Sequence, residues 1–157
     1  MPWQKGSSKL GQPHKHAGLS LQATTKLDDI DIAQMAKAAA EAASVKVPQW
    51  SSVRLERTDP GLLVFSVRGP GGLVEQMVFQ LTASNVDGLT GLKSSILRYK
   101  TSQTTVFGFI PVAPKRMLGL QAHRKWITNF ASALKAADST AQIDINGPLD
   151  GAGALWI

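Results

Sequence analysis

The chain has 157 residues, of which 43% are hydrophobic and 18% are charged, as expected for one globular domain with a hydrophobic core. It contains no cysteine, which excludes disulfides, thiolate metal sites and a cysteine nucleophile. No apolar run approaches the roughly 18 residues of a membrane-spanning helix, and the first residues lack the apolar core of a secretory signal. We therefore expect a cytoplasmic protein.

The formal net charge of +6 is unevenly distributed along the chain. Residues 1–19 carry three lysines and no acid, and residues 47–117 carry eight Lys/Arg against four Asp/Glu. Basic segments of this kind suit an acidic protein, an anionic membrane or a nucleic acid. We predict that residues 1–17 form a flexible basic arm, residues 18–138 a single folded domain, and the Gly- and Pro-punctuated residues 139–157 a flexible tail.

The folded part begins with a strand and a helix. Residues 18–25 alternate apolar and polar side chains, which predicts a strand with one buried face. Three aspartates then crowd residues 28–31, where a helix dipole favours negative charge, and apolar residues recur at helical spacing up to about Ser44. The helix is rich in alanine, so it can pack closely against a sheet.

A meander of strands follows the helix. Strands are predicted around residues 53–56, 62–68, 73–82, 93–100 and 104–110, separated by turn signals such as Asp59-Pro60-Gly61. Their spacing of about ten residues favours antiparallel pairing, because parallel strands need crossovers of a dozen or more residues. Pro111 and Pro114 cannot continue a ladder, and Pro114 suits the first turn of a helix that reaches Ala137, although Gly119 moves its start toward Leu120.

These elements predict an α+β fold in which an antiparallel meander packs against a long C-terminal helix, with one N-terminal helix. The stretches LSLQATTKLDDIDIAQMAKAAAEA, VEQMVFQLTASNVDGLTGLKSSILRYK and residues 104–138 together resemble the START/Bet v 1-like helix-grip superfamily, which includes polyketide cyclase/dehydrase-type proteins. The resemblance covers about residues 18–138. It implies a curved sheet that wraps around the C-terminal helix, with an apolar cavity between them for a lipid, sterol, polyketide or other hydrophobic molecule.

Large aromatic side chains at sheet and helix positions are candidates for lining such a cavity. Apolar pockets with a few polar groups are the usual form of small-ligand sites, and the alternative is that the same rings fill the core completely. The candidate ligand-binding residues are Tyr99, Phe107, Phe109, Trp126 and Phe130.

A second candidate site is basic. Lys115 and Arg116 follow Pro114 at the predicted helix N-terminus, where free backbone N–H groups and the dipole already favour an anion. Arg98 and Lys100 on the preceding strand can add to this anion-binding site. The alternative is a basic turn that contacts only water.

No motif predicts catalysis, a cofactor or a metal. The pair His14 and His16 lacks a third ligand nearby, and His123 is expected on the surface among cations. We expect a non-enzymatic protein that binds a small hydrophobic or amphipathic ligand in a cavity between sheet and helix. The alternative is an interaction module whose basic surface and arm contact an acidic protein, an anionic membrane or a nucleic acid.

Overall fold

The computed structural model describes residues 3–5, 15–44, 51–103, 105–112 and 116–147. In chain order the elements are β1 (Trp3–Lys5), β2 (Ser20–Thr25), α1 (Asp29–Ala43), β3 (Ser52–Asp59), β4 (Leu62–Arg68), the 3-10 turn η1 (Pro70–Gly72), β5 (Glu75–Val86), β6 (Leu89–Ser102), β7 (Thr105–Val106), β8 (Ile110–Pro111), β9 (Arg116–Met117), α2 (Leu120–Ala137) and β10 (Gln142–Asn146).

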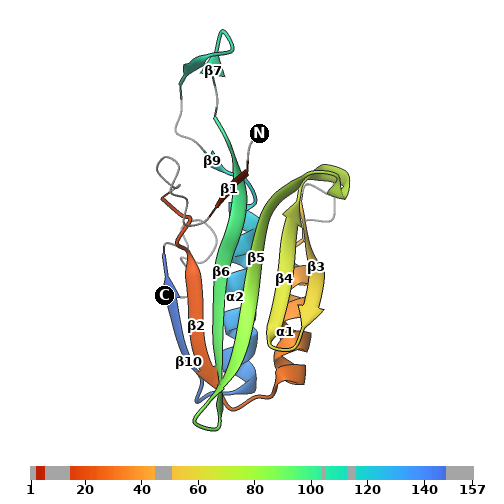
Figure 1. Cartoon of the computed structure of the whole chain (residues 1–157), viewed down its shortest axis with the longest axis vertical. Coiled ribbons are helices and arrows are strands. Elements are labelled where there is room, and N and C mark those ends of the chain that lie inside the picture. Colours follow the sequence, from red (N-terminus) through yellow and green to blue (C-terminus); the bar gives the residue numbers. More distant parts are fainter. Residues whose placement is uncertain (1–2, 6–14, 45–50, 104, 113–115, 148–157) are drawn as a thin grey trace.

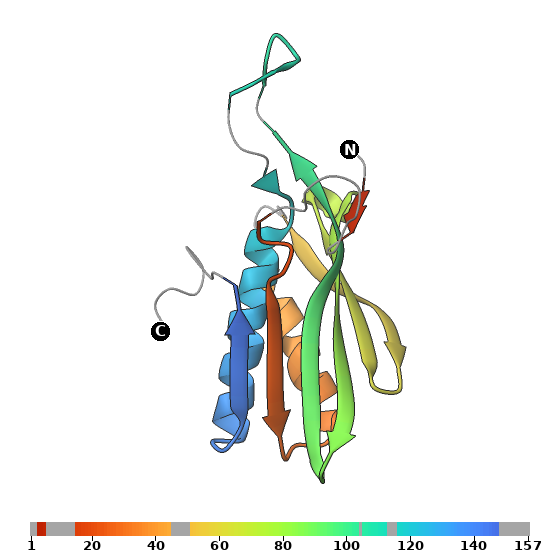
Figure 2. The same ribbon diagram turned by 60° about the vertical axis from the view of Figure 1, so that its left-hand side comes forward.

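One antiparallel sheet carries most of the structure. Its strands lie in the order β10-β2-β6-β5-β4-β3, and the short strands β1 and β9 both pair with β6. The meander from β3 to β6 is antiparallel throughout, and β2 returns to pair with the first half of β6. Both helices lie on one face of this sheet (Figures 1 and 2). The predicted fold class, an α+β meander with one N-terminal and one long C-terminal helix, is confirmed.

Helix α1 begins at Asp29, within the run of aspartates that the sequence placed at a helix start. Asp28 is the N-cap, and its carboxylate accepts a hydrogen bond from the Asp31 N–H at 2.9 Å. The helix ends at Ser44, whose hydroxyl donates to the Ala40 carbonyl at 3.1 Å and accepts from the Val53 N–H at 3.0 Å. Ser44 thereby connects the end of α1 to the start of the meander.

The core lies between the sheet and the two helices. Every second residue of β2, β4 and β5 points inward, as the period-two pattern predicts, and the alanine-rich face of α1 lies against α2. The largest side chains with under 2% exposure are Trp126, Tyr99, Phe65, Phe79 and Phe130.

A buried carboxylate links the turn after α2 to the junction between β2 and α1. Asp138 directly follows α2 and is 1% exposed. It accepts hydrogen bonds from the hydroxyls of Thr140 at 2.6 Å and Thr25 at 2.7 Å, and from the Lys26 N–H at 3.1 Å. These bonds, that of Thr140 foremost, hold the pKa of the Asp138 carboxyl far below its ordinary value. Asp138 thus holds the turn after α2 against the β2–α1 junction.

That turn leads to a strand where we predicted a flexible tail. β10 pairs with β2 over five residue pairs, from Gln142 opposite Thr24 to Asn146 opposite Ser20. The prediction is therefore wrong for residues 142–146, because the half-buried Ile143 and Ile145 pack against the core. Residues 3–5 of the predicted arm likewise pair with β6. Residues 148–157 of the predicted tail lie outside the described residues.

The predicted strand 104–110 is also wrong. Residues 105–106 and 110–111 pair only with each other and form a two-stranded hairpin that projects beyond the end of the sheet (Figure 1). The chain then returns to β6 through β9, and α2 begins at Leu120 after Gly119 rather than at Pro114. β6 is paired with β5 on one side and with β2, β1 and β9 in turn on the other, so neither side of β6 is open to another full strand.

Candidate functional site

The structure separates the five predicted ligand-binding residues into two places. Tyr99, Trp126 and Phe130 are completely buried between the sheet and α2. Phe107 and Phe109 are 85% and 75% exposed on the projecting hairpin. The five rings therefore do not line one cavity.

The buried rings contact one another across the space where the cavity was predicted. The Trp126 ring lies 5.1 Å from Phe130, 4.9 Å from Phe79 and 5.5 Å from Phe65, measured between ring centroids. The Trp126 indole N–H donates to the Ala36 carbonyl of α1 at 3.1 Å. These distances are those of packed aromatic pairs, so this cluster fills the space between the sheet and α2.

His123 belongs to the same cluster, and its predicted surface position is wrong. Its side chain has no exposure, its ring centroid lies 4.6 Å from that of Phe79, and neither ring nitrogen has a hydrogen-bond partner in the described part of the chain. Burial, together with the nearby Arg124 charge, lowers its pKa to about 3. The imidazole is therefore neutral at physiological pH and packs as a core side chain.

The hairpin of residues 105–112 exposes an unusual amount of apolar surface. Phe109 donates its N–H to the Val106 carbonyl at 3.3 Å, which closes a tight turn with Phe107 and Gly108 at its centre. Around this turn five large apolar side chains are at least two-fifths exposed, namely Val106, Phe107, Phe109, Ile110 and Val112. Soluble domains rarely expose contiguous apolar groups in this way without an interaction partner.

The backbone of the turn is strained at one of these residues. Phe107 has a φ of 54° and Gly108 a φ of 77°. Glycine adopts positive φ freely, whereas a bulky residue in this region is an outlier that costs roughly 1–2 kcal/mol. Strain of this kind concentrates at functional positions. Phe107 is therefore placed where the turn itself would favour glycine or asparagine.

Cations lie on the strands beside the base of the hairpin. β9 pairs with the end of β6, with Arg116 opposite Ser102, so that Arg116 lies on the strand next to the one that carries Arg98 and Lys100. Arg116 and Arg98 are exposed, and Arg98 forms an ion pair with Glu75 at 3.4 Å. The structure thus places these three predicted anion-binding residues on neighbouring strands. Lys115 lies outside the described residues.

The segment that carries these cations contains no acid of its own. Residues 88–137 contain no Asp or Glu and carry eight cations, namely Lys93, Arg98, Lys100, Lys115, Arg116, Arg124, Lys125 and Lys135. The prediction that a helix N-terminus contributes to this anion site is nevertheless wrong for Arg116. That residue is in β9, and α2 starts four residues later. The basic character comes from side chains alone.

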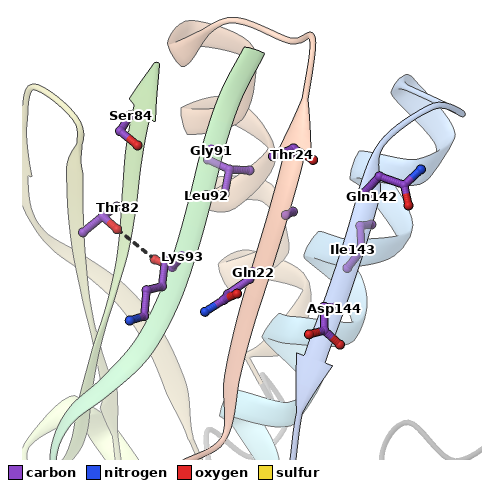
Figure 3. A pocket seen from close by; sticks show the side chains of 11 residues that line it. Gln22, Thr24, Thr82, Ser84, Gly91, Leu92, Lys93, Gln142, Ile143 and Asp144 are labelled. Carbon is purple, nitrogen blue, oxygen red and sulfur yellow. Dashed lines mark hydrogen bonds between the residues drawn. The ribbon is translucent and has the colours of Figure 1, made fainter. Parts of the chain in front are cut away.

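A polar hollow of about 540 Å³ lies over the open face of the sheet (Figure 3). Its walls come from β2, β5, β6 and β10, and the Thr82 hydroxyl donates to the Lys93 carbonyl at 3.2 Å beside it. Its lining contains amides, hydroxyls, one amine and one carboxylate, from residues such as Gln22, Lys93 and Asp144. No histidine or aromatic ring lines it, so the hollow offers no stacking platform.

Among the described residues, no cluster of three or more His, Asp or Glu side chains could hold a metal ion. His14 of the His14/His16 pair lies outside them. Neither of the two described helices is long and apolar enough to cross a membrane.

Comparison with known protein families, curated proteins and solved structures gives no match. The resemblance to the START/Bet v 1-like superfamily therefore stays a prediction, and the candidate site is judged on its geometry alone. That geometry favours the hairpin. Gly108 within the run Val106–Ile110 was the signal that could have identified it, because an isolated glycine in an apolar run marks a turn or bulge.

Proposed function

We propose that the protein binds peripherally to an anionic membrane surface, with the hairpin of residues 105–112 inserted among the lipids. The single observation that carries this proposal is the exposure of Phe107 and Phe109, at 85% and 75%, on a hairpin that projects from the sheet. The cations of β6 and β9 then face the lipid headgroups. This is a non-enzymatic interaction function of the kind that the basic composition suggested.

The expected energies are sufficient for reversible binding. Removing a Phe side chain from water contributes ~1.5–3 kcal/mol, so two of them supply most of the apolar component. A Lys or Arg near an anionic surface adds about 1 kcal/mol. Arg116, Lys100 and Arg98 lie close enough in the sheet to act together, and one acid, Glu75, is paired with Arg98.

The shape and chemistry of the hairpin favour a membrane over the other partners. A nucleic acid would use the Phe rings for stacking, but it offers nothing to aliphatic side chains such as Val106, Ile110 and Val112, which are 41–54% exposed. An acidic protein would need a matching apolar pocket for a convex tip. A bilayer accepts an apolar tip of any shape and supplies negative charge at its surface.

Vesicle sedimentation tests the proposal. The full chain is mixed with vesicles of phosphatidylcholine alone or with added phosphatidylserine, and binding is compared with that of the double variant Phe107→Ser/Phe109→Ser. The matched control is Ile30→Ser, which removes an apolar side chain that is 69% exposed on α1. Because two Phe side chains are lost, we expect the double variant to bind about 100-fold more weakly, while the control binds like the wild type.

Charge is tested in the same assay. Arg116→Gln should weaken binding to anionic vesicles about five-fold, and added salt should weaken wild-type binding further. Equal binding to both kinds of vesicle, or full binding by the double variant, would refute the proposal. Salt-dependent binding to a single-stranded oligonucleotide that the double variant loses, without vesicle binding, would assign the hairpin to nucleic acid instead.

A further inference from the structure

A second apolar feature lies at the opposite end of the molecule from the hairpin (Figure 1). It is a hollow of about 330 Å³ between the first half of α1 and the turn that joins β3 to β4. Leu63 and Leu81 of the sheet and Ile32 of α1 form buried parts of its lining, and Ile30 and Leu62 form more exposed parts. Its volume is at the lower end of the range of small-ligand sites.

The hollow exists because α1 is held toward α2 by short side chains. Ala36 and Ala40 are buried, and the Ala36 carbonyl accepts the Trp126 N–H, which fixes the middle of α1 beside α2. One turn earlier, Ala33 faces the hollow with a single methyl group. A larger side chain at Ala33 would fill this space.

The rim opposite α1 is rigid. Gly61 has a φ of 71°, and its carbonyl accepts a hydrogen bond from the Ala83 N–H at 2.9 Å. A Cβ atom at Gly61 would lie 2.8 Å from the Ala83 carbonyl oxygen, so the turn depends on glycine. The hollow is thus bounded by a fixed turn on one side and by a helix on the other.

The charges around the hollow indicate the kind of polar group that it can accept. Asp29, Asp59 and Lys37 contribute to its lining, and Asp59 forms an ion pair with Arg57. With Arg57 counted, two acids face two cations, so the rim carries no net charge that would compensate a carboxylate or phosphate for its lost hydration. Gln34 and Thr58, which also line it, offer neutral donors and acceptors.

We propose that this hollow binds a small hydrophobic molecule with one uncharged polar end, such as a medium-chain or aromatic alcohol. The apolar part lies over Leu63, Leu81 and Ala33, and the polar end meets Gln34 and Thr58. This places the ligand function expected from the sequence between α1 and the sheet, away from the packed rings of α2. The site is independent of the proposed membrane contact, since no hairpin residue lines it.

Titration of the full-length wild type with decanol and, separately, decanoate tests the assignment by methyl NMR. Decanol should shift the methyl signals of Ile32, Leu63 and Leu81, with saturation, and leave those of the buried α2 residues Ile127 and Leu134 unchanged. Decanoate should bind at least ten-fold more weakly, because its carboxylate loses hydration without meeting a net positive charge at the rim.

Two leucine variants give a matched pair on the same helix. Ala33→Leu fills the hollow and should abolish the decanol shifts, whereas Ala38→Leu changes an exposed position and should leave them intact. Absence of saturable shifts in the wild type, tighter binding of decanoate, or undiminished binding by Ala33→Leu would each overturn the proposal. The wild-type titration decides it even if Ala33→Leu does not fold. Loss of vesicle binding in hairpin variants leaves these shifts unaffected, so the two proposals fail separately.

Discussion

The molecule places aromatic side chains in two opposite environments. In the core, Trp126 and Phe130 have no exposure and stack with ring centroids 5.1 Å apart. On the hairpin, Phe107 and Phe109 are almost fully exposed. The first pair has neighbours on the sheet and on α1, whereas the second pair lies on a projection that pairs only with itself.

The two regions therefore meet different physical requirements. Burial of the core rings stabilises the fold, and a cavity there would lower its stability. Exposure of the hairpin rings contributes nothing comparable to folding, and the positive φ of Phe107 opposes it. An exposed and strained aromatic residue is more informative about function than a buried one.

The largest expected effect is a difference in stability between a variant of the core and a variant of the hairpin. Phe130→Ala should lower the free energy of unfolding by ~3–5 kcal/mol, because it removes a ring from the packed cluster. Phe109→Ala should change it by no more than about 0.5 kcal/mol, since its ring is 75% exposed. Urea unfolding of both variants measures the difference. Similar losses for the two would mean that Phe109 packs against the body of the protein.

A pH effect should also be confined to the core. The pKa of His123 is about 3 in the folded protein against an ordinary value near 6.5, so the unfolded state binds a proton that the native state does not. Stability should therefore fall as pH decreases from about 6.5 to 3, by up to ~1.4 kcal/mol per pH unit from this residue.

His123→Leu should remove the dependence between about pH 6.5 and 4, below which the lowered pKa of Asp138 also contributes. It should raise stability at neutral pH by about 1 kcal/mol, because two unpaired buried nitrogens disappear. Thermal unfolding at several pH values measures it. Phe109→Ala is the control and should keep the wild-type dependence. An unchanged slope in His123→Leu would show that the loss of stability arises elsewhere.

The smallest expected effect on stability concerns the strained turn. Phe107→Asn should raise the free energy of unfolding by up to about 1 kcal/mol, because asparagine tolerates positive φ, and should weaken vesicle binding about ten-fold or more. Gly108→Ala is the opposite control. This variant keeps both rings, and its added methyl group meets no atom within 4 Å. Its free energy of unfolding should fall by about 1 kcal/mol, because alanine is strained at a φ of 77°. A lower free energy of unfolding in Phe107→Asn than in the wild type would show that the backbone at Phe107 is not strained.

Local sequence pattern was enough to determine most of the fold. Period-two alternation identified the strands of the meander. The Asp87-Gly88 pair, a turn-forming sequence, adopts φ of 53° and 82° in the tight turn between β5 and β6. The acidic start and the alanines of residues 28–43 predicted α1. These features depend only on neighbours a few residues apart, so no knowledge of the tertiary structure was needed.

The candidate sites depended on contacts that local pattern does not encode. Val106–Ile110 has the composition of a buried strand, and only the occupied edges of β6 leave it outside the sheet. His123 has cationic neighbours in sequence, yet it lies in the core because its face of α2 meets Phe79. The predicted tail contains a strand because Asp138 is held by Thr25, 113 residues away in the sequence, which directs β10 to β2.

Sequence alone therefore determined most of the segments that form strands and helices, because that choice depends mainly on short-range periodicity and turn chemistry. Tertiary structure alone decided which aromatic residues are buried, because burial depends on whether a partner surface remains available once the other strands have paired. Phe130 packs against such a surface and is buried, whereas Phe107 and Phe109 remain exposed.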